Sequence, residues 1–166
     1  MALPPDDPCR PPREYPRPGP VYACACPSAV GAHPRPAGRA VIDRFTAALE
    51  AVGGHVHHGR EALDRLRGEG VSVTPCLALV AETGTVVVSS RLLGGRRPSL
   101  VDPVHVVEAR ADQLVPDLAT ALTVIEPELR ASSAVTLITG PSRTADIEQT
   151  LIRGVHGPGD VHVVFV

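Results

Sequence analysis

The sequence contains no lysine and no tryptophan, and its 166 residues include only two phenylalanines and two tyrosines. All 16 basic residues are therefore arginines, and the formal net charge is −2. Nucleic-acid-binding proteins usually need a basic surface for phosphates and aromatic rings that stack on bases. This composition argues against nucleic acid as a partner, and it requires a core built mainly from valine, leucine, isoleucine and alanine.

Long apolar runs and metal-binding cysteine patterns are also missing. No run approaches the roughly 20 apolar residues that a membrane span needs, and no signal-peptide core precedes the domain. We therefore expect a cytoplasmic protein. Cys24 and Cys26 are separated by one residue, which is too few for a zinc knuckle, and no iron–sulfur motif is present. We expect no metal and no cofactor in this chain; Cys76 is expected to be a buried small residue, with a reactive thiol as the alternative.

The chain divides into two parts of different composition. Eleven of the 18 prolines lie between Pro4 and Pro36. Proline removes backbone donors and is incompatible with helix interiors and central strands, so residues 1–38 are predicted to be an extended or disordered tail. A proline-rich ligand for another domain is the alternative reading. Residues 39–166 have a globular composition and are long enough to form one domain with a hydrophobic core.

Strand-type and helix-type patterns alternate along residues 39–166. Apolar residues at helical spacing predict helices over 41–52 and 60–67, and a third within 113–129 that begins near Val115. Apolar, β-branched runs predict strands over 54–58, 71–73, 77–82, 85–89, 103–109, 135–139 and 161–166. This alternation favours an α/β fold with a Rossmann-like, largely parallel sheet and flanking helices. The last two strands lack polar alternation, so both of their faces are expected to be covered.

Residues 140–158 lie between the last two predicted strands, and the pattern predicts a tight turn followed by a helix. Hydroxyls, a guanidinium and backbone N–H groups gather where that helix would begin, which is a favourable place for an anion. The candidate anion-binding residues are Gly140, Ser142, Arg143 and Thr144. Helix capping alone accounts for the same residues equally well.

Two further segments contain candidate site residues. Glu82 ends an apolar strand and could act as a general base or nucleophile if partly buried; a simple turn residue is the alternative. Arg91, Arg96 and Arg97 lie in a glycine-containing loop that could close over an anion, and Arg96 and Arg97 complete the candidate anion-binding set. A solvated cluster of charges is the alternative for this loop.

The histidines give a weaker pattern. His55 and His57 share a face of a short strand by the two-residue period, while His58 lies on the opposite face. Two imidazoles without a third ligand do not favour a metal site. His105 and His156 stand alone in the sequence, and His156 is the better placed of the two to face a site.

Four segments, in this order along the chain, resemble the LUD (lactate utilisation) domain family, LutC/YkgG branch. The longest is GPSRTADIEQTLIRGVHGPGDVHVVFV at 140–166. The others are FTAALEAVGGHVHH at 45–58, AETGTVVVSS at 81–90 and GGRRPSLVDPVHVVEARADQL at 94–114. The resemblance extends over residues 41–166. Members of this family usually have a helical region where this chain has its proline-rich segment.

The resemblance implies a fold similar to NagB, ribose-5-phosphate isomerase and the CoA transferases. LutC-type proteins are linked to oxidation of L-lactate to pyruvate, together with a cysteine-rich oxidoreductase subunit and an iron–sulfur protein that also carries a LUD domain. The absence of cluster cysteines here fits the LutC type. The family supplies no established catalytic residue to place on this sequence.

The sequence therefore predicts a subunit or accessory protein of a lactate-oxidising system that binds a small anion through the 140–144 turn. A self-sufficient enzyme acting on a sugar phosphate or CoA ester, with Glu82 as its catalytic group, is one alternative. A pure protein-interaction module recruited through the proline-rich tail is the other.

Overall fold

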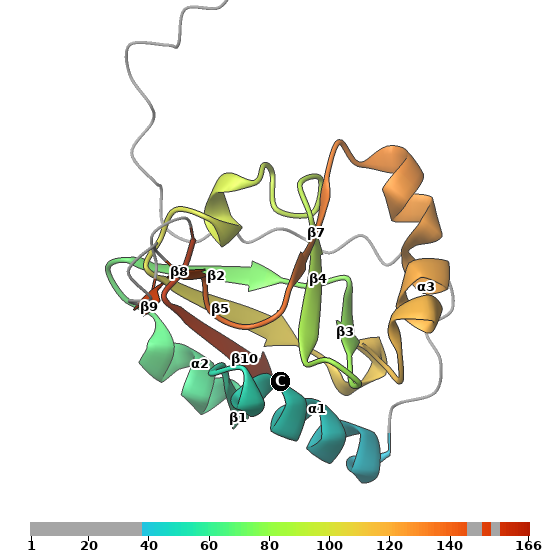
Figure 1. Cartoon of the computed structure of the whole chain (residues 1–166), viewed down its shortest axis with the longest axis horizontal. Helices are drawn as coiled ribbons and strands as arrows, with labels where there is room; N and C mark the ends of the chain where they lie inside the picture. Colours follow the sequence, from blue (N-terminus) through green and yellow to red (C-terminus); the bar gives the residue numbers. More distant parts are fainter. Residues whose placement is uncertain (1–37, 146–150, 154–156) are drawn as a thin grey trace, which may run out of the picture.

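A computed structural model describes residues 38–145, 151–153 and 157–166, which form two four-stranded sheets with helices on their outer faces (Figure 1). The proline-rich segment expected to be a tail lies, apart from Gly38, outside the described residues. None of the helices in these ranges is long and apolar enough to cross a membrane.

The first sheet is entirely parallel. Its strand order is β1-β10-β5-β2, formed by His55–His58, Asp160–Phe165, Val104–Ala109 and Val71–Pro75. Helix α2 (Arg60–Leu66) covers one face, where its Ala62 and Leu63 pack against Val106 and Val164. β10 is apolar over most of its length because both faces are covered there, as parallel strands in α/β proteins require.

The second sheet is mixed, with the order β6-β3-β4-β7. Its strands are Leu114–Val115, Ala78–Val80, Thr85–Ser89 and Val135–Ile138. β3 pairs antiparallel with β4 and parallel with β6, while β4 pairs antiparallel with β7. Helix α3 (Leu118–Ala131) packs on its outer face, and two short 3-10 turns, Arg97–Ser99 and Ala111–Gln113, lie in the connections. The expected α/β fold with a largely parallel sheet and flanking helices is confirmed, with this mixed sheet as an addition.

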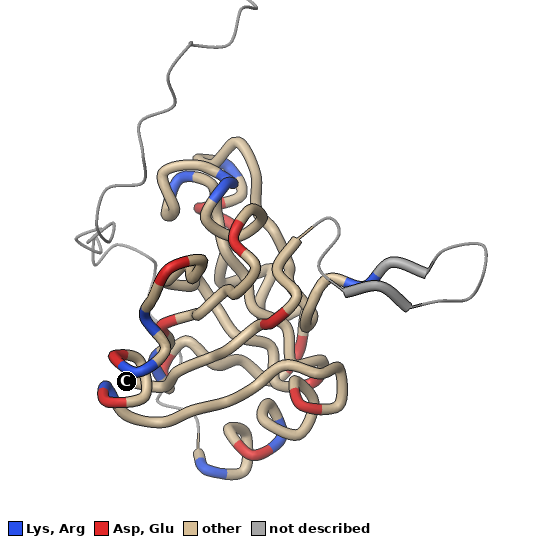
Figure 2. Tube along the Cα trace, turned by 90° about the vertical axis from the view of Figure 1, so that its left-hand side faces the viewer, with Lys and Arg blue, Asp and Glu red and all other residues tan. Residues whose placement is uncertain are grey.

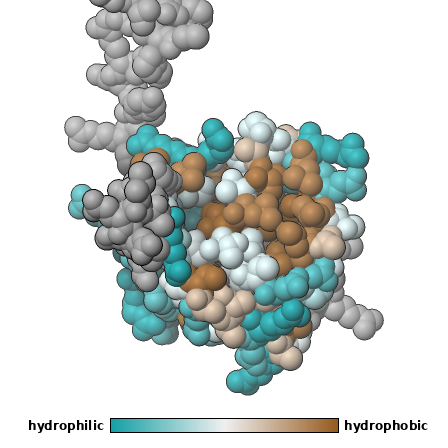
Figure 3. Space-filling model, in the orientation of Figure 1, coloured by the Kyte–Doolittle hydropathy of each residue, from teal (hydrophilic) through white to brown (hydrophobic). Residues whose placement is uncertain are grey.

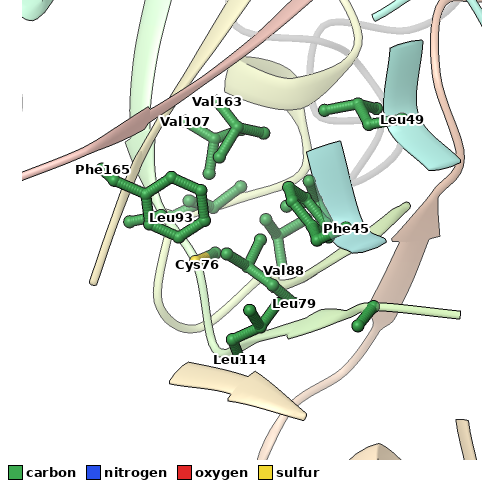
Figure 4. Packing of buried hydrophobic residues seen from close by; sticks show 13 residues of the cluster. Phe45, Leu49, Cys76, Leu79, Val88, Leu93, Val107, Leu114, Val163 and Phe165 are labelled. Carbon is green, nitrogen blue, oxygen red and sulfur yellow. The ribbon is translucent and has the colours of Figure 1, made fainter. Parts of the chain in front are cut away.

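The main core lies between the two sheets and helix α1 (Arg39–Ala51) (Figure 4). Phe45 and Leu49 of α1 are fully buried, and the ring of Phe45 meets that of Phe165 edge-on with centroids 6.0 Å apart. Cys76 is 3% exposed within the same cluster, which confirms the expectation of a buried small residue. Valine and leucine fill most of the remaining volume, as the scarcity of aromatic residues required.

The third helix begins later than the sequence pattern predicted. Leu114 and Val115 form strand β6 beside β3, and the Asp117 side chain caps α3 by accepting a hydrogen bond from the Thr120 N–H at 2.7 Å. Pro116 therefore precedes the cap instead of lying in the first turn. The predicted start near Val115 is wrong because pairing with β3 outweighs the helical spacing of the apolar residues.

The helix predicted after Gly140 is also wrong. Strands β8 (Arg143–Ala145) and β9 (Leu151–Arg153) pair antiparallel and form a third, two-stranded sheet. The pairing bonds the backbone groups that face each other across the two segments, in place of helical hydrogen bonds. β7, just before this turn, is an edge strand with Leu137 43% exposed, so the expectation that both of its faces are covered is wrong as well.

Candidate functional site

The turn that joins β3 to β4 is the first component of the candidate site. Gly84 has a φ of +65°, a conformation that side chains disfavour, and its N–H donates to the Val80 carbonyl. The hydroxyls of Thr83 and Thr85 lie 2.6 Å apart, and Thr85 is in turn 2.8 Å from the hydroxyl of Thr139 at the end of β7. A chain of three hydroxyls thus links this turn to the residue before Gly140.

Glu82 lies in this turn with an exposed side chain. Its backbone N–H donates to the Pro116 carbonyl at 3.1 Å, which fixes the main chain and leaves the carboxylate toward solvent. Partial burial was the condition on which the catalytic hypothesis depended, and this condition is not met. The catalytic role of Glu82 and its turn-residue alternative both stay predictions.

The Gly140 turn is the second component, and it packs against the end of helix α1. Gly140 has a φ of +79°, and a Cβ there would lie 2.8 Å from the Val52 Cγ2 atom. The Arg143 guanidinium donates a hydrogen bond to the Val52 carbonyl. The Ser142 N–H donates to the Pro158 carbonyl at 2.8 Å, which ties the turn to the start of the final segment.

Helix α1 brings the two turns together. A Cβ at Gly84 would lie 2.4 Å from the Leu49 backbone nitrogen, and Gly140 meets Val52 one turn further along. The structure thus places Glu82, the three threonines and the 140–143 turn around one helix end. The sequence alone did not show that these segments meet.

The electrostatics of this helix end differ from those expected. An anion was predicted at a helix N-terminus, where the dipole is positive, but Arg143 lies at the C-terminal end of α1, where it is negative. A guanidinium there stabilises the helix by binding an unpaired carbonyl. An anion at this turn would have to compete with Val52 for Arg143. Thr144 lies in β8, and its side chain is outside the described set.

Arg96 and Arg97 lie at the other end of β4, in the loop that follows Ser89. Both side chains are exposed, and the loop is held by Arg91, which pairs with the Glu128 carboxylate of α3. The hydrogen bond from Arg91 lowers the pKa of Glu128. The five-residue strand β4 lies between this loop and the Gly140 turn. At about 3.3 Å per residue, the two ends of this strand are roughly 13 Å apart. The structure thus does not bring the two groups of the expected anion-binding set together.

A cluster of three histidines lies on the first sheet, and sequence reasoning missed one of its members. His55 pairs in register with His162 of β10, and the Nε2 atom of His57 lies 3.0 Å from the Nδ1 atom of His162. The His162 ring stacks on both partners, with centroids 4.8 and 5.3 Å apart. Burial, followed by the neighbouring imidazoles, lowers the pKa values of His57 and His162.

Across the described ranges, no group of three or more His, Cys, Asp or Glu side chains is arranged to hold a metal ion. His105 is fully buried, and burial lowers its pKa to about 4. His156 lies outside the described residues. The missed His162 stands alone in an apolar strand, so only the parallel register with β1 could have revealed the cluster.

Acidic and basic residues are mixed along the described part of the chain. Figure 2 shows acidic and basic positions interleaved along the described chain, without an extended basic face. This distribution agrees with the small net charge of −2.

Comparison with known proteins now places the chain in a family. The profile of the LUD domain matches residues 70–166, which include every strand from β2 to β10. The chain belongs to the LUD domain family. The crystal structure of a DUF162 family protein from Deinococcus radiodurans has the same fold, with a TM-score of 0.59 over 79% of this chain and 99% of that one, at 19% identity.

Several relatives of this LUD domain are named lactate utilization protein C. The protein from Deinococcus radiodurans is 34% identical over 95 residues, which cover 57% of this chain and 45% of the relative. Those from Geobacillus kaustophilus and Bacillus subtilis are each 34% identical over 104 residues, covering 60% of this chain and 43% of theirs. The chain thus spans less than half the length of these relatives.

Proposed function

We propose that this LUD domain is a cytoplasmic, LutC-type subunit or accessory protein of a system that oxidises L-lactate to pyruvate. The observation that carries the proposal is the family match over residues 70–166, together with relatives named lactate utilization protein C at 34% identity. The matched range contains the β3–β4 turn and the Gly140 turn, so both components of the candidate site belong to the shared domain.

The proposal assigns the redox chemistry to partner subunits. An iron–sulfur protein with its own LUD domain and a cysteine-rich oxidoreductase subunit would hold the electron-transferring cofactors. The described part of this chain contains one cysteine, Cys76, and it is buried in the core. A protein of this kind contributes binding and assembly, for which the exposed Arg143 beside a helix end is suitable.

The finer proposal is a small-anion site at the 140–144 turn. Arg143 is exposed and reaches the end of α1, and its guanidinium can exchange the Val52 carbonyl for a carboxylate. The exposed Thr139 lies next to this turn, and its hydroxyl can donate to a second oxygen of the anion. L-lactate and pyruvate, the substrate and product of the proposed system, are the small carboxylates that we expect to bind at this site.

Growth of a deletion strain tests the system-level proposal. A strain that lacks this gene, and has no paralogue, is expected to fail on L-lactate and to grow normally on pyruvate, because only the oxidation step is lost. The full-length gene should restore growth. Unimpaired growth of the deletion strain on L-lactate would count against the proposed function.

Thermal shift of the purified chain tests the anion site separately. L-lactate or pyruvate in large excess is expected to raise the melting temperature by a few degrees, because a ligand that binds only the folded state stabilises it. Arg143→Ala should remove the shift, and Arg96→Ala, in the distant loop, should keep it. A shift produced only by sugar phosphates or CoA esters would instead favour a self-sufficient enzyme.

A further inference from the structure

Helix α3 has an apolar stripe that no described residue covers. Its buried side consists of Ala121, Ile125 and Glu128, which face the second sheet. Leu118, Leu122 and Leu129 recur at helical spacing on the neighbouring side and are 39%, 43% and 45% exposed. Three leucines in one exposed row are more than the scattered apolar residues of an ordinary surface.

Strand β7 extends this apolar surface and has an open edge. Among the described strands it pairs only with β4, so its other edge has backbone groups without a strand partner. Proteins usually protect such edges with charged residues or proline, but β7 reads Val-Thr-Leu-Ile and has neither. Leu137, in the middle of the strand, is 43% exposed.

The stripe and the open edge lie on the same side of the molecule. Val135 packs with the α3 core cluster, and Leu137 follows two residues later on the same face of the strand. Figure 3 shows a continuous hydrophobic region over β7 and the adjoining side of α3. We call Leu118, Leu122, Leu129 and Leu137, with the edge of β7, the α3–β7 surface.

The absence of net charge on this surface is compatible with binding a second copy of the same surface. The exposed charges of α3 are Glu126 and Arg130, which pair with each other at 2.8 Å. Glu128 points inward to Arg91. The α3–β7 surface therefore has no net charge, so two copies can approach without repulsion and a strongly charged partner gains nothing from it.

We propose that the α3–β7 surface binds a second copy of this chain. A two-fold axis beside β7 would pair the two strands antiparallel and join the two mixed sheets into one sheet of eight strands. That arrangement closes the open edge of each copy with the other and leaves no new edge exposed. The leucine row of each α3 would then lie on the same face of the joined sheet as Leu137.

Solution mass and surface variants test the proposal. Light scattering and sedimentation of the full chain should give twice its mass of 17.4 kDa at micromolar concentration, with dissociation on dilution. Leu122→Glu combined with Leu137→Glu should weaken the association by at least about 100-fold, because the second change places a charge on the paired strand and the first places one in the apolar region beside it. Circular dichroism should show that this variant keeps its fold.

Leu100→Glu combined with Val101→Glu is the matched control. These two residues are 43% and 58% exposed and lie in the loop after Arg97–Ser99, away from α3 and β7. The control should remain dimeric, and hydrogen exchange should show protected amides at Val135 and Leu137, which point away from β4, in the wild type and the control but not in the Leu122/Leu137 variant. A wild-type monomer at all concentrations, or a dimer that survives the Leu122/Leu137 change, would overturn the proposal.

Discussion

Protonation of His105 should make this domain unstable in mild acid. The imidazole is fully buried, its Nε2 atom lies 2.8 Å from the Thr74 hydroxyl, and its Nδ1 atom has no hydrogen-bond partner among the described residues. A neutral ring that donates through Nε2 leaves only a bare acceptor at Nδ1. A proton added there would create a buried charge and a donor without an acceptor, which is why burial lowers the pKa to about 4.

The size of the effect follows from proton linkage. The His105 pKa is lowered from 6.5 to about 4 on folding, so the unfolded chain binds the proton more readily. The contribution of neutral, buried His105 to the free energy of unfolding is complete above pH 6.5 and decreases as the pH falls toward 4. Between about pH 7.5 and about pH 5, the titration of His105 should decrease the free energy of unfolding by about 2 kcal/mol. Below both the folded and the unfolded pKa of His105, the total decrease should reach about 3 kcal/mol.

Urea unfolding at the two pH values measures this loss. His57 and His162 also have lowered pKa values and add to the wild-type loss, so the comparison with His105→Gln isolates one residue. The Gln variant should lose about 2 kcal/mol less than the wild type over this pH range. Thr74→Val keeps the imidazole and should retain the full dependence. Equal losses in the wild type and the Gln variant would refute the reasoning.

Two further predictions concern the candidate site. Gly84→Ala should lower the free energy of unfolding by about 2–4 kcal/mol, because the new Cβ would lie 2.4 Å from the Leu49 backbone nitrogen. Gly94 is the control, since it has a similar φ of +66° but open space around it. Gly94→Ala should lower the free energy of unfolding by about 1 kcal/mol. Equal costs in urea unfolding would show that contact with α1 is unimportant. Without ligand, Arg143→Ala should lower the free energy of unfolding by about 0.5–1 kcal/mol, because the hydrogen bond to the Val52 carbonyl is lost. An unchanged free energy of unfolding would show that Arg143 does not stabilise the helix end.

Local patterns in the sequence predicted the parts of the fold that depend on neighbouring residues. The strands on either side of Gly84 and their tight turn were predicted correctly, because two apolar, β-branched runs separated by Thr83 and Gly84 are sufficient to specify a hairpin. Helix α1 followed in the same way from its apolar spacing. The segment after Gly140 failed because its residues suit a helix start by local criteria, whereas the strand pairing of β8 with β9 decides the outcome.

The candidate site was harder to predict because its contacts join distant parts of the chain. Arg143 was identified as a candidate residue, but its partner Val52 is 91 residues away. His162 was missed since its neighbour His57 is 105 residues away and meets it only through the parallel register of β1 and β10. A single sequence contains the residue types of such sites without showing which segments lie side by side.

The position of β10 has a consequence for how the chain folds during synthesis. β10 lies between β1 and β5 in the parallel sheet, yet it is the last strand of the described sequence. Until residues 160–165 leave the ribosome, β1 has no neighbour in that sheet and β5 has one open side. Pairings between segments so far apart are slow to form, and their unpaired edges expose the nascent chain to aggregation. β10 emerges after β1, β2 and β5, and completion of the first sheet therefore depends on it.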